Sequence, residues 1–180
     1  MKNKLLGLLF GLVLLFSLTA CGGDGESASK VVNIYNWGEY IDPDLITKFE
    51  EETGITVIYS NFTTNEDLYV KLKNGGSNYD LITPSDYMLE RMIQEGMVQE
   101  LNFDNIPNLE YVDAEYLNHT YDPDQEYSVP YFWGTLGIVY NTTMVDEPVI
   151  SWDILWDEDY ARNVIMLDSS RDSLAVAQIG

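Results

Sequence analysis

Apolar and polar residues alternate along residues 31–96 in the way that is typical of strands followed by helices. Three short runs rich in β-branched and apolar residues predict buried strands. Each run is followed by a stretch with apolar residues three and four positions apart, which predicts an amphipathic helix. Strands that alternate with helices predict a parallel sheet covered on both faces. The predicted strands are Val31–Tyr35, Ile55–Tyr59 and Tyr79–Thr83.

Each expected helix begins after a residue that can cap it and ends close to a glycine. The clearest case is Asp42, which precedes Pro43, since proline is favoured in the first turn of a helix. The other two helices are expected to begin at Asn65 or Glu66 and after the cap Ser85, and the three end near Gly54, Gly75 and Gly96.

Residues 102–127 are less regular, and the elements that follow them predict a second α/β lobe. The extended crossing Tyr131–Tyr140 is the candidate boundary, with residues 31–134 as the first lobe and residues 135–180 as the start of a second. A second lobe of that size is below the ~50 residues of a usual domain, so we expect it to be incomplete in this chain. The elements expected here are a short helix over Leu109–Leu117, an extended stretch over Tyr127–Tyr140, a helix over Ser151–Tyr160, a strand over Asn163–Leu167 and a helix from Arg171.

The N-terminal residues have the layout of a secretory signal. A basic start, Met1–Lys4, precedes the apolar run Leu5–Leu18, and small residues stand just before Cys21. This layout resembles the lipobox of bacterial lipoproteins, which implies cleavage after residue 20 and a lipid on Cys21. The apolar run is short for a ~30 Å hydrocarbon core, so a signal-anchor helix is the less favoured alternative.

Cys21 is the only cysteine of the chain, so an internal disulfide is excluded. Residues 21–30 are small and polar, and they predict a flexible tether. The signal, the lipidated cysteine and the tether together predict an extracytoplasmic protein that is anchored to a bacterial membrane face.

The chain carries thirty acidic and nine basic residues. Removal of Lys2 and Lys4 with the signal leaves seven basic residues and a net charge of −23. Nucleic acid is therefore disfavoured as a partner, because binding it needs a basic surface. A surface of this sign concentrates cations, although acidity that serves solubility alone is an open alternative.

Aromatic rings and carboxylates recur where three predicted strands end, in Asn36–Tyr40, Pro84–Tyr87 and Asp168–Asp172. Ligands of open α/β sheets bind beyond the carboxyl ends of the strands. Rings contact methylene groups and attract ammonium groups, and carboxylates accept hydrogen bonds from amine nitrogens. The pattern therefore favours an organic amine as ligand.

Three of these residues also have simpler interpretations. Trp37 could be a core tryptophan, Asp86 could favour the dipole of the helix that it begins, and Asp168 could be a helix cap. These alternatives stay open from the sequence alone.

Catalytic and metal-binding motifs give weaker signals. The single histidine, His119, lies in a polar stretch, and the spacings of serine hydrolases, zinc proteases and P-loop proteins do not occur. A carboxylate pair for glycoside hydrolysis can be proposed among thirty acids, but it is unspecific. Residues 122–126 begin like a calcium loop, yet the glycine and the final glutamate of such a loop are missing, so we interpret them as a turn. We expect no cofactor and no metal.

Four segments resemble the spermidine/putrescine-binding proteins of polyamine ABC transporters, in the same order. They are Asn36–Ile41, Thr83–Met88, Tyr127–Gly134 and Ser151–Trp156. The resemblance implies two α/β lobes that close on a polyamine and deliver it to a membrane permease, without catalysis.

The resemblance also implies a partial binding site. Trp37 and Tyr40 match aromatics that pack on the polyamine, whereas Gly38 stands where some relatives have a hydroxyl residue. Asp172 matches a carboxylate that meets an amine, and Ser169 stands where some relatives have an acid. The candidate ligand-binding residues are Trp37, Glu39, Tyr40, Ser85, Asp86, Tyr87, Asp168 and Asp172.

Three alternatives remain beside polyamine binding. The first is a binding protein for another solute, such as a sugar or a metal complex. The second is an extracellular glycoside hydrolase, and the third is an adhesin-like surface protein without a small ligand.

Overall fold

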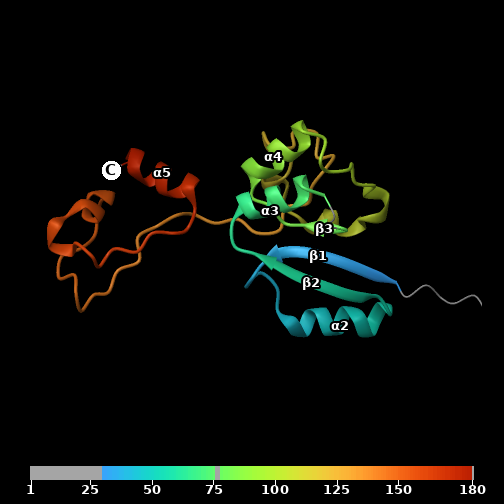
Figure 1. The fold of residues 1–180 in the computed structure, drawn as a ribbon, viewed down its shortest axis with the longest axis horizontal. Coiled ribbons are helices and arrows are strands. Elements are labelled where there is room, and N and C mark those ends of the chain that lie inside the picture. Colours follow the sequence, from blue (N-terminus) through green and yellow to red (C-terminus); the bar gives the residue numbers. More distant parts are fainter. Residues whose placement is uncertain (1–29, 76–77, 180) are drawn as a thin grey trace, which may run out of the picture.

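The computed structural model describes residues 30–75 and 78–179. Their centre is a parallel sheet with the strand order β2-β1-β3 (Figure 1). The strands are β1 (Val31–Trp37), β2 (Thr56–Phe62) and β3 (Leu81–Ile82). All three predicted strands are confirmed, and β1 pairs with β2 along its full length, from Val31 opposite Thr56 to Trp37 opposite Phe62. The predicted parallel sheet is therefore present.

Helices cover both faces of this sheet. Helix α2 (Pro43–Thr53) lies on one face, and α3 (Asn65–Lys73) and α4 (Asp86–Gln94) lie on the other (Figure 1). The Asp42 side chain caps α2 by accepting a hydrogen bond from the Asp44 N–H at 2.9 Å. Gly54 ends α2 with φ +67°, a left-handed conformation that favours glycine. Both ends of α2 therefore agree with the prediction.

The prediction that the Ser85 side chain caps α4 is wrong. Ser85 stands at the N-cap position of α4, but its side chain makes no capping hydrogen bond. The hydroxyl instead accepts a hydrogen bond from the Asn65 Nδ2 atom at 2.9 Å, and this long-range partner could not be read from the local sequence.

The core lies between the sheet and the α3–α4 layer. One cluster joins Tyr35, Phe62 and Leu68, and a second joins Tyr69, Met88 and Met92. Leu68 and Met92 are fully buried. These clusters connect the three strands to α3 and α4, so they fix where the strand ends and the following loops lie.

Residues 102–134 form turns of 3-10 helix rather than the predicted helix over Leu109–Leu117. The turns are η1 (Phe103–Asn105), η2 (Pro107–Tyr111) and η3 (Ala114–Tyr116). Asp113 interrupts the predicted helix, because its extended backbone lets the side chain accept a hydrogen bond from the Glu115 N–H. Aspartate favours such caps over helix interiors.

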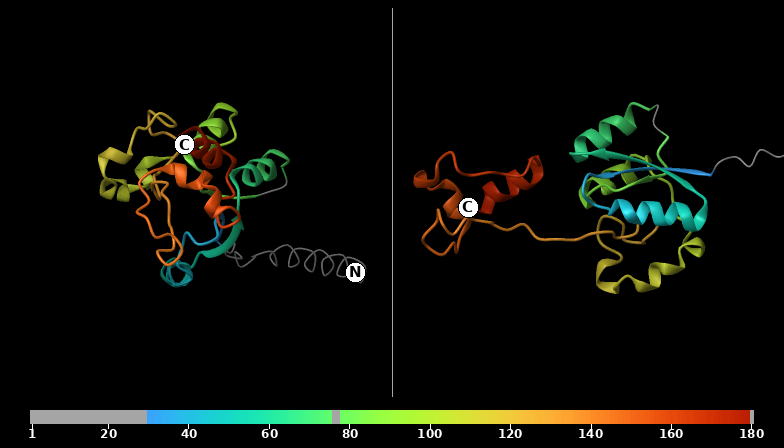
Figure 2. Two further views of the ribbon diagram at one scale, coloured as in Figure 1. Left: turned by 90° about the vertical axis from the view of Figure 1, so that its left-hand side faces the viewer. Right: turned by 90° about the horizontal axis from the view of Figure 1, so that it is seen from below.

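An extended segment leads from the N-terminal part (residues 31–134) to the C-terminal part (residues 135–179), which lies to one side of the sheet (Figure 2). The predicted stretch Tyr127–Tyr140 has no regular secondary structure. Helix α5 (Ser170–Ile179) is confirmed, and it begins next to Arg171 as predicted.

Two predicted elements of the C-terminal part are wrong. The helix over Ser151–Tyr160 is instead the pair of turns η4 (Trp152–Trp156) and η5 (Glu158–Tyr160), because Asp157 is extended and caps η5. The strand over Asn163–Leu167 does not form. Ile165 in its middle is 95% exposed, so the segment has no neighbouring strand to pair with in the described residues.

The signal over residues 1–20, the lipidation at Cys21 and the tether up to residue 29 lie outside the described residues. Within residues 30–75 and 78–179, the helices are too short or too polar to cross a bilayer.

Candidate functional site

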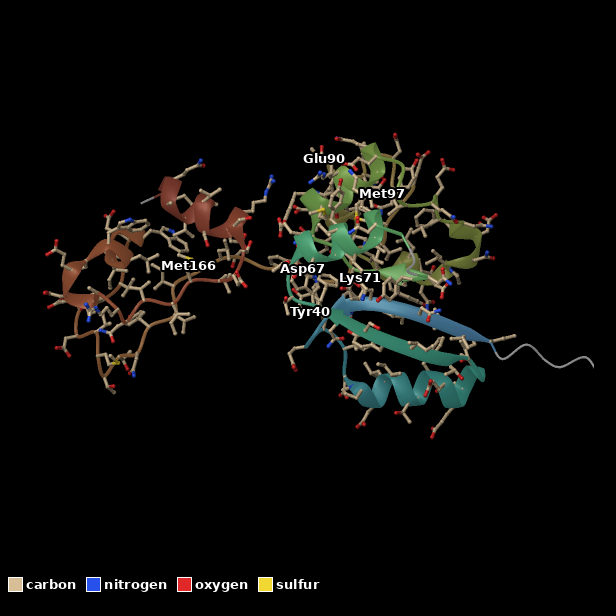
Figure 3. The ribbon with its side chains drawn as sticks, in the orientation of Figure 1. Tyr40, Asp67, Lys71, Glu90, Met97 and Met166 are labelled. Atoms are coloured by element: carbon tan, nitrogen blue, oxygen red, sulfur yellow. The ribbon has the colours of Figure 1, made fainter. Side chains whose placement is uncertain are left out.

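Trp37 and Tyr40 lie together where β1 ends. Their ring centroids are 5.9 Å apart, and the Trp37 ring also contacts Phe62 with a centroid distance of 4.5 Å. Phe62 ends β2 directly opposite Trp37, so the register of two parallel strands brings these rings to one edge. Figure 3 shows Tyr40 at this end of the sheet, on the side of the C-terminal part. Trp37 and Tyr40 of the first predicted segment, Asn36–Tyr40, therefore form an aromatic wall with Phe62 at the carboxyl edge of the sheet.

Polar contacts hold the Trp37 backbone in place. Its N–H donates to the Asn36 Oδ1 atom at 2.8 Å, and its carbonyl accepts a hydrogen bond from the Tyr59 hydroxyl at 3.1 Å. Asn36 is buried. Burial of the Tyr59 phenol raises its pKa above the usual value.

The crossing segment completes the aromatic wall. The Tyr131 hydroxyl donates a hydrogen bond to the Tyr40 carbonyl, and the Phe132 ring meets Tyr40 edge to face at a centroid distance of 5.1 Å. Sequence reasoning assigned neither Tyr131 nor Phe132 to the site. The three consecutive aromatic residues at positions 131–133, at the predicted boundary between the lobes, are the sequence feature that could have indicated them.

Asn65, which is 6% exposed, holds the second predicted segment, Pro84–Tyr87, in place. Its Oδ1 atom accepts a hydrogen bond from the Ser85 N–H at 2.9 Å, and its Nδ2 atom donates to the Ser85 hydroxyl at the same distance. Two residues further on, the Tyr87 hydroxyl lies 3.4 Å from the Glu66 Oε1 atom. Burial is the main reason that the pKa of Tyr87 is raised. Ser85 and Tyr87 are thus positioned by the start of α3, a role that sequence reasoning missed.

The third predicted segment, Asp168–Asp172, contacts the second through Arg171. The Arg171 Cζ atom lies over the Tyr87 ring, 4.5 Å from its centroid. The neighbouring Asp172 is half-buried, and its N–H donates to the Ser169 hydroxyl at 3.3 Å. The first turn of α5 therefore lies beside the first turn of α4. Ser169, rather than Asp168, supplies the side-chain oxygen at the start of α5.

Three predicted site residues make none of these contacts between segments, namely Glu39, Asp86 and Asp168. The Asp86 carboxylate accepts a hydrogen bond from the neighbouring Tyr87 N–H at 2.6 Å, which fits the helix-dipole interpretation. Glu39 and Asp168 are exposed, and neither side chain forms a hydrogen bond or ion pair within the described residues. Their role in a site stays a prediction.

A hollow of about 550 Å³ lies in the C-terminal part. It is lined mainly by apolar residues between Thr135 and Leu167, together with Asp172 and Val176. The aromatic wall and Tyr87 do not line it, whereas Asp172, a predicted site residue, does.

The acidic turn that begins at Asp122 is a structural element. Asp122 is buried, and its carboxylate accepts hydrogen bonds from the Glu126 and Tyr127 N–H groups and from the Ser128 hydroxyl. Among residues 30–75 and 78–179, no group of three or more acids, histidines or cysteines is arranged to hold a metal ion.

Comparison with known proteins places this arrangement in a family. Residues 44–180 match the family described as bacterial extracellular solute-binding protein. The chain belongs to this solute-binding family. Among curated members, the spermidine/putrescine-binding periplasmic protein of Salmonella typhimurium is 39% identical over 153 residues, which are 84% of this chain and 44% of that protein. The resemblance inferred from four sequence segments is thereby confirmed.

Solved structures of the solute-binding family share the fold. A spermidine/putrescine ABC transporter protein from Listeria monocytogenes matches with a TM-score of 0.80 and 42% identity, over 82% of this chain and 46% of the other. The TpPotD lipoprotein of Treponema pallidum matches with a TM-score of 0.77 and 34% identity, over 82% of this chain and 47% of the other. The predicted α/β class is confirmed.

The chain spans about half the length of the curated relatives that it matches. This share agrees with the predicted incompleteness of the second lobe. The aromatic wall and the first turns of α4 and α5 thus belong to the part of a solute-binding protein that this chain covers.

Proposed function

We propose that this protein is an extracytoplasmic solute-binding lipoprotein that captures a polyamine, such as spermidine or putrescine, and passes it to the permease of an ABC transporter. The proposal rests first on the aromatic wall, because the Trp37 and Tyr40 rings lie together at the carboxyl edge of the sheet. Each ring face contributes about 0.5–2 kcal/mol to the binding of an ammonium group.

The chemistry of the aromatic wall and of the first turn of α5 fits an alkyl amine. The rings can cover methylene groups, each of which adds roughly 0.8 kcal/mol when buried. Asp172 supplies a half-buried carboxylate on the first turn of α5, where it can accept charge-assisted hydrogen bonds from an amine nitrogen. The net charge of the chain also favours a cation over an anionic solute.

The relatives support the same ligand class. The Salmonella relative is named for binding spermidine and putrescine, and a 38% identical relative from Escherichia coli is named for putrescine alone. These relatives are binding proteins, which favours binding over glycoside hydrolysis here. We propose the boundaries 1–20, 21–30, 31–134 and 135–180 for the signal, the lipidated tether and the two lobes.

Thermal unfolding of the complete mature protein tests the identity of the ligand. The sample begins at Gly22, so that it lacks the predicted signal and Cys21. Spermidine or putrescine at a hundred times its dissociation constant should raise the free energy of unfolding by about 2.7 kcal/mol. A panel of sugars should leave it unchanged. A shift with a sugar and none with either polyamine would overturn the ligand assignment, and it would leave the family membership intact.

A further inference from the structure

The Tyr131 side chain holds the main chain of Tyr40. Tyr40 lies in the loop over residues 38–41, and this loop makes no backbone–backbone hydrogen bond within the described residues. The Tyr131 hydroxyl donates to the Tyr40 carbonyl across 91 residues of sequence. Trp37, just before the loop, differs, because both its N–H and its carbonyl are hydrogen-bonded to nearby side chains of the sheet. The position of Tyr40 therefore depends on the crossing segment, residues 131–140.

Aromatic contacts reinforce this connection. The Tyr40 ring contacts Trp37 at a centroid distance of 5.9 Å, and it meets the Phe132 ring edge to face at 5.1 Å. The Tyr131 ring lies 4.3 Å from the Phe132 ring and 6.4 Å from the Tyr40 ring. Tilted and edge-to-face pairs at such distances are favourable. Figure 3 shows Tyr40 at the end of the sheet that faces the C-terminal part. Tyr40 is thus the wall residue that the crossing segment contacts.

These contacts lie outside the core. Tyr131 is 48% exposed and Tyr40 is 37% exposed, and neither belongs to the two clusters that join the sheet to α3 and α4. Loss of the Tyr131 hydroxyl should therefore leave the fold intact and release only the loop that carries Tyr40.

We propose that Tyr131 is a positioning residue of the binding site, whose hydroxyl keeps the Tyr40 ring in the aromatic wall by holding the Tyr40 carbonyl. This role rests on the proposed function, because it matters only if the wall binds a ligand. A loop that is ordered before the ligand arrives loses less conformational freedom on binding, so the hydrogen bond raises the affinity. Tyr131 acts through Tyr40 and needs no contact with the ligand.

Tyr131→Phe tests this role, because it keeps the aromatic ring and removes only the hydroxyl. Calorimetric titration of the complete mature protein, beginning at Gly22, should give a dissociation constant for spermidine about fivefold higher than that of the unsubstituted protein, as expected for one neutral hydrogen bond. The thermal midpoint without ligand should fall by less than about 2 °C, since the substitution lies at the surface.

A double-mutant cycle with Tyr40→Ala separates positioning from a general effect on the protein. Without the Tyr40 ring nothing is left to position, so Tyr131→Phe should cause no further loss of affinity when it is added to Tyr40→Ala. A merely structural role would weaken binding by the same factor in both backgrounds. Tyr111→Phe is the matched control, since Tyr111 is 79% exposed and its hydroxyl makes no hydrogen bond among the described residues.

Unchanged affinity in Tyr131→Phe, or an equal loss in both backgrounds, would overturn the role of Tyr131 while polyamine binding stands. Unchanged affinity in Tyr40→Ala would overturn it as well, because Tyr40 would then lie outside the site. Failure of the unsubstituted protein to bind spermidine would instead overturn the proposed function on which this role depends.

Discussion

The Tyr69 hydroxyl donates a hydrogen bond to the Glu95 Oε2 atom over 2.7 Å, and this bond joins α3 to the end of α4. Lys73 and Arg91 also donate hydrogen bonds to the Glu95 carboxylate, at 2.9 Å each. The Tyr69 hydrogen bond, followed by those from Lys73 and Arg91, lowers the pKa of Glu95 from 4.5 to about 2. Glu95 is therefore a charged link between two helices that position the site.

Glu95→Gln should lower the thermal midpoint at pH 7 by about 2–4 °C, because the amide cannot attract both cations. The pKa of Glu95 is lower in the folded protein than in the unfolded chain. Its contribution to the free energy of unfolding is therefore complete above pH 4.5 and is lost as the pH falls from 4.5 toward 2. Thermal unfolding followed by circular dichroism from pH 7 to pH 2 measures this dependence.

Glu51→Gln serves as the control, since Glu51 is exposed on α2 and its side chain makes no hydrogen bond within the described residues. The two midpoint curves should diverge at pH 7 and converge near pH 2. A pH-independent gap between them would mean that the Glu95 charge does not stabilise the α3–α4 pair.

Asp122→Asn should lower the free energy of unfolding by about 1–3 kcal/mol. The buried Asp122 carboxylate accepts three hydrogen bonds, and an amide NH₂ in place of one oxygen would face a donor instead. Denaturant titration measures the loss. Asp124→Asn in the same turn is the control, because Asp124 is exposed and its side chain is free of hydrogen bonds among the described residues. Equal stability of the two variants would contradict the structural role of Asp122.

The sequence predicted the sheet and its helices well because their signals are local. The ends of α2 depend on Asp42, Pro43 and Gly54, which are adjacent to the helix in the chain. In contrast, Asp113 and Asp157 split two predicted helices by accepting hydrogen bonds from N–H groups two residues ahead. The strand predicted over residues 163–167 does not form, because a strand needs a neighbour to pair with, and that depends on distant sequence.

The candidate site was predictable only in part for the same reason. The rule that ligands bind at the carboxyl ends of strands pointed to Trp37 and Tyr40 without knowledge of the structure. Tyr131 hydrogen-bonds to Tyr40 across 91 residues of sequence, and no periodicity relates the two positions. Likewise, the stacking of Arg171 on Tyr87 depends on how the two parts of the chain meet.

Trp37→Ala should weaken polyamine binding by more than tenfold in the full-length protein. The substitution removes a ring face and the apolar surface that covers methylene groups, and a loss of about 1.4 kcal/mol is already tenfold. Calorimetric titration with spermidine and putrescine measures the effect. Tyr111→Ala is the matched control, since Tyr111 is 79% exposed on η2 and outside the aromatic wall. Unchanged affinity in Trp37→Ala would remove Trp37 from the site.

Cys21→Ser should abolish lipid attachment and release the protein from the membrane fraction. A serine hydroxyl cannot take the place of the thiol in the thioether that anchors a bacterial lipoprotein. Labelled palmitate followed by fractionation measures both effects, and Ser27→Ala in the predicted tether is the control. Retention of label by Cys21→Ser would show that the predicted lipobox is not used.

Asp172→Asn should also weaken polyamine binding by about tenfold or more, because a charge-assisted hydrogen bond contributes roughly 1.5–3 kcal/mol. The substitution keeps the size of the side chain, and the Asp172 N–H keeps its bond to the Ser169 hydroxyl, so the start of α5 should stay intact. Asp124→Asn removes one negative charge as well, from another part of the chain, and controls for general electrostatics. If both variants lose affinity equally, the acidic surface as a whole attracts the ligand. If only Asp172→Asn does, the carboxylate of Asp172 meets an amine nitrogen.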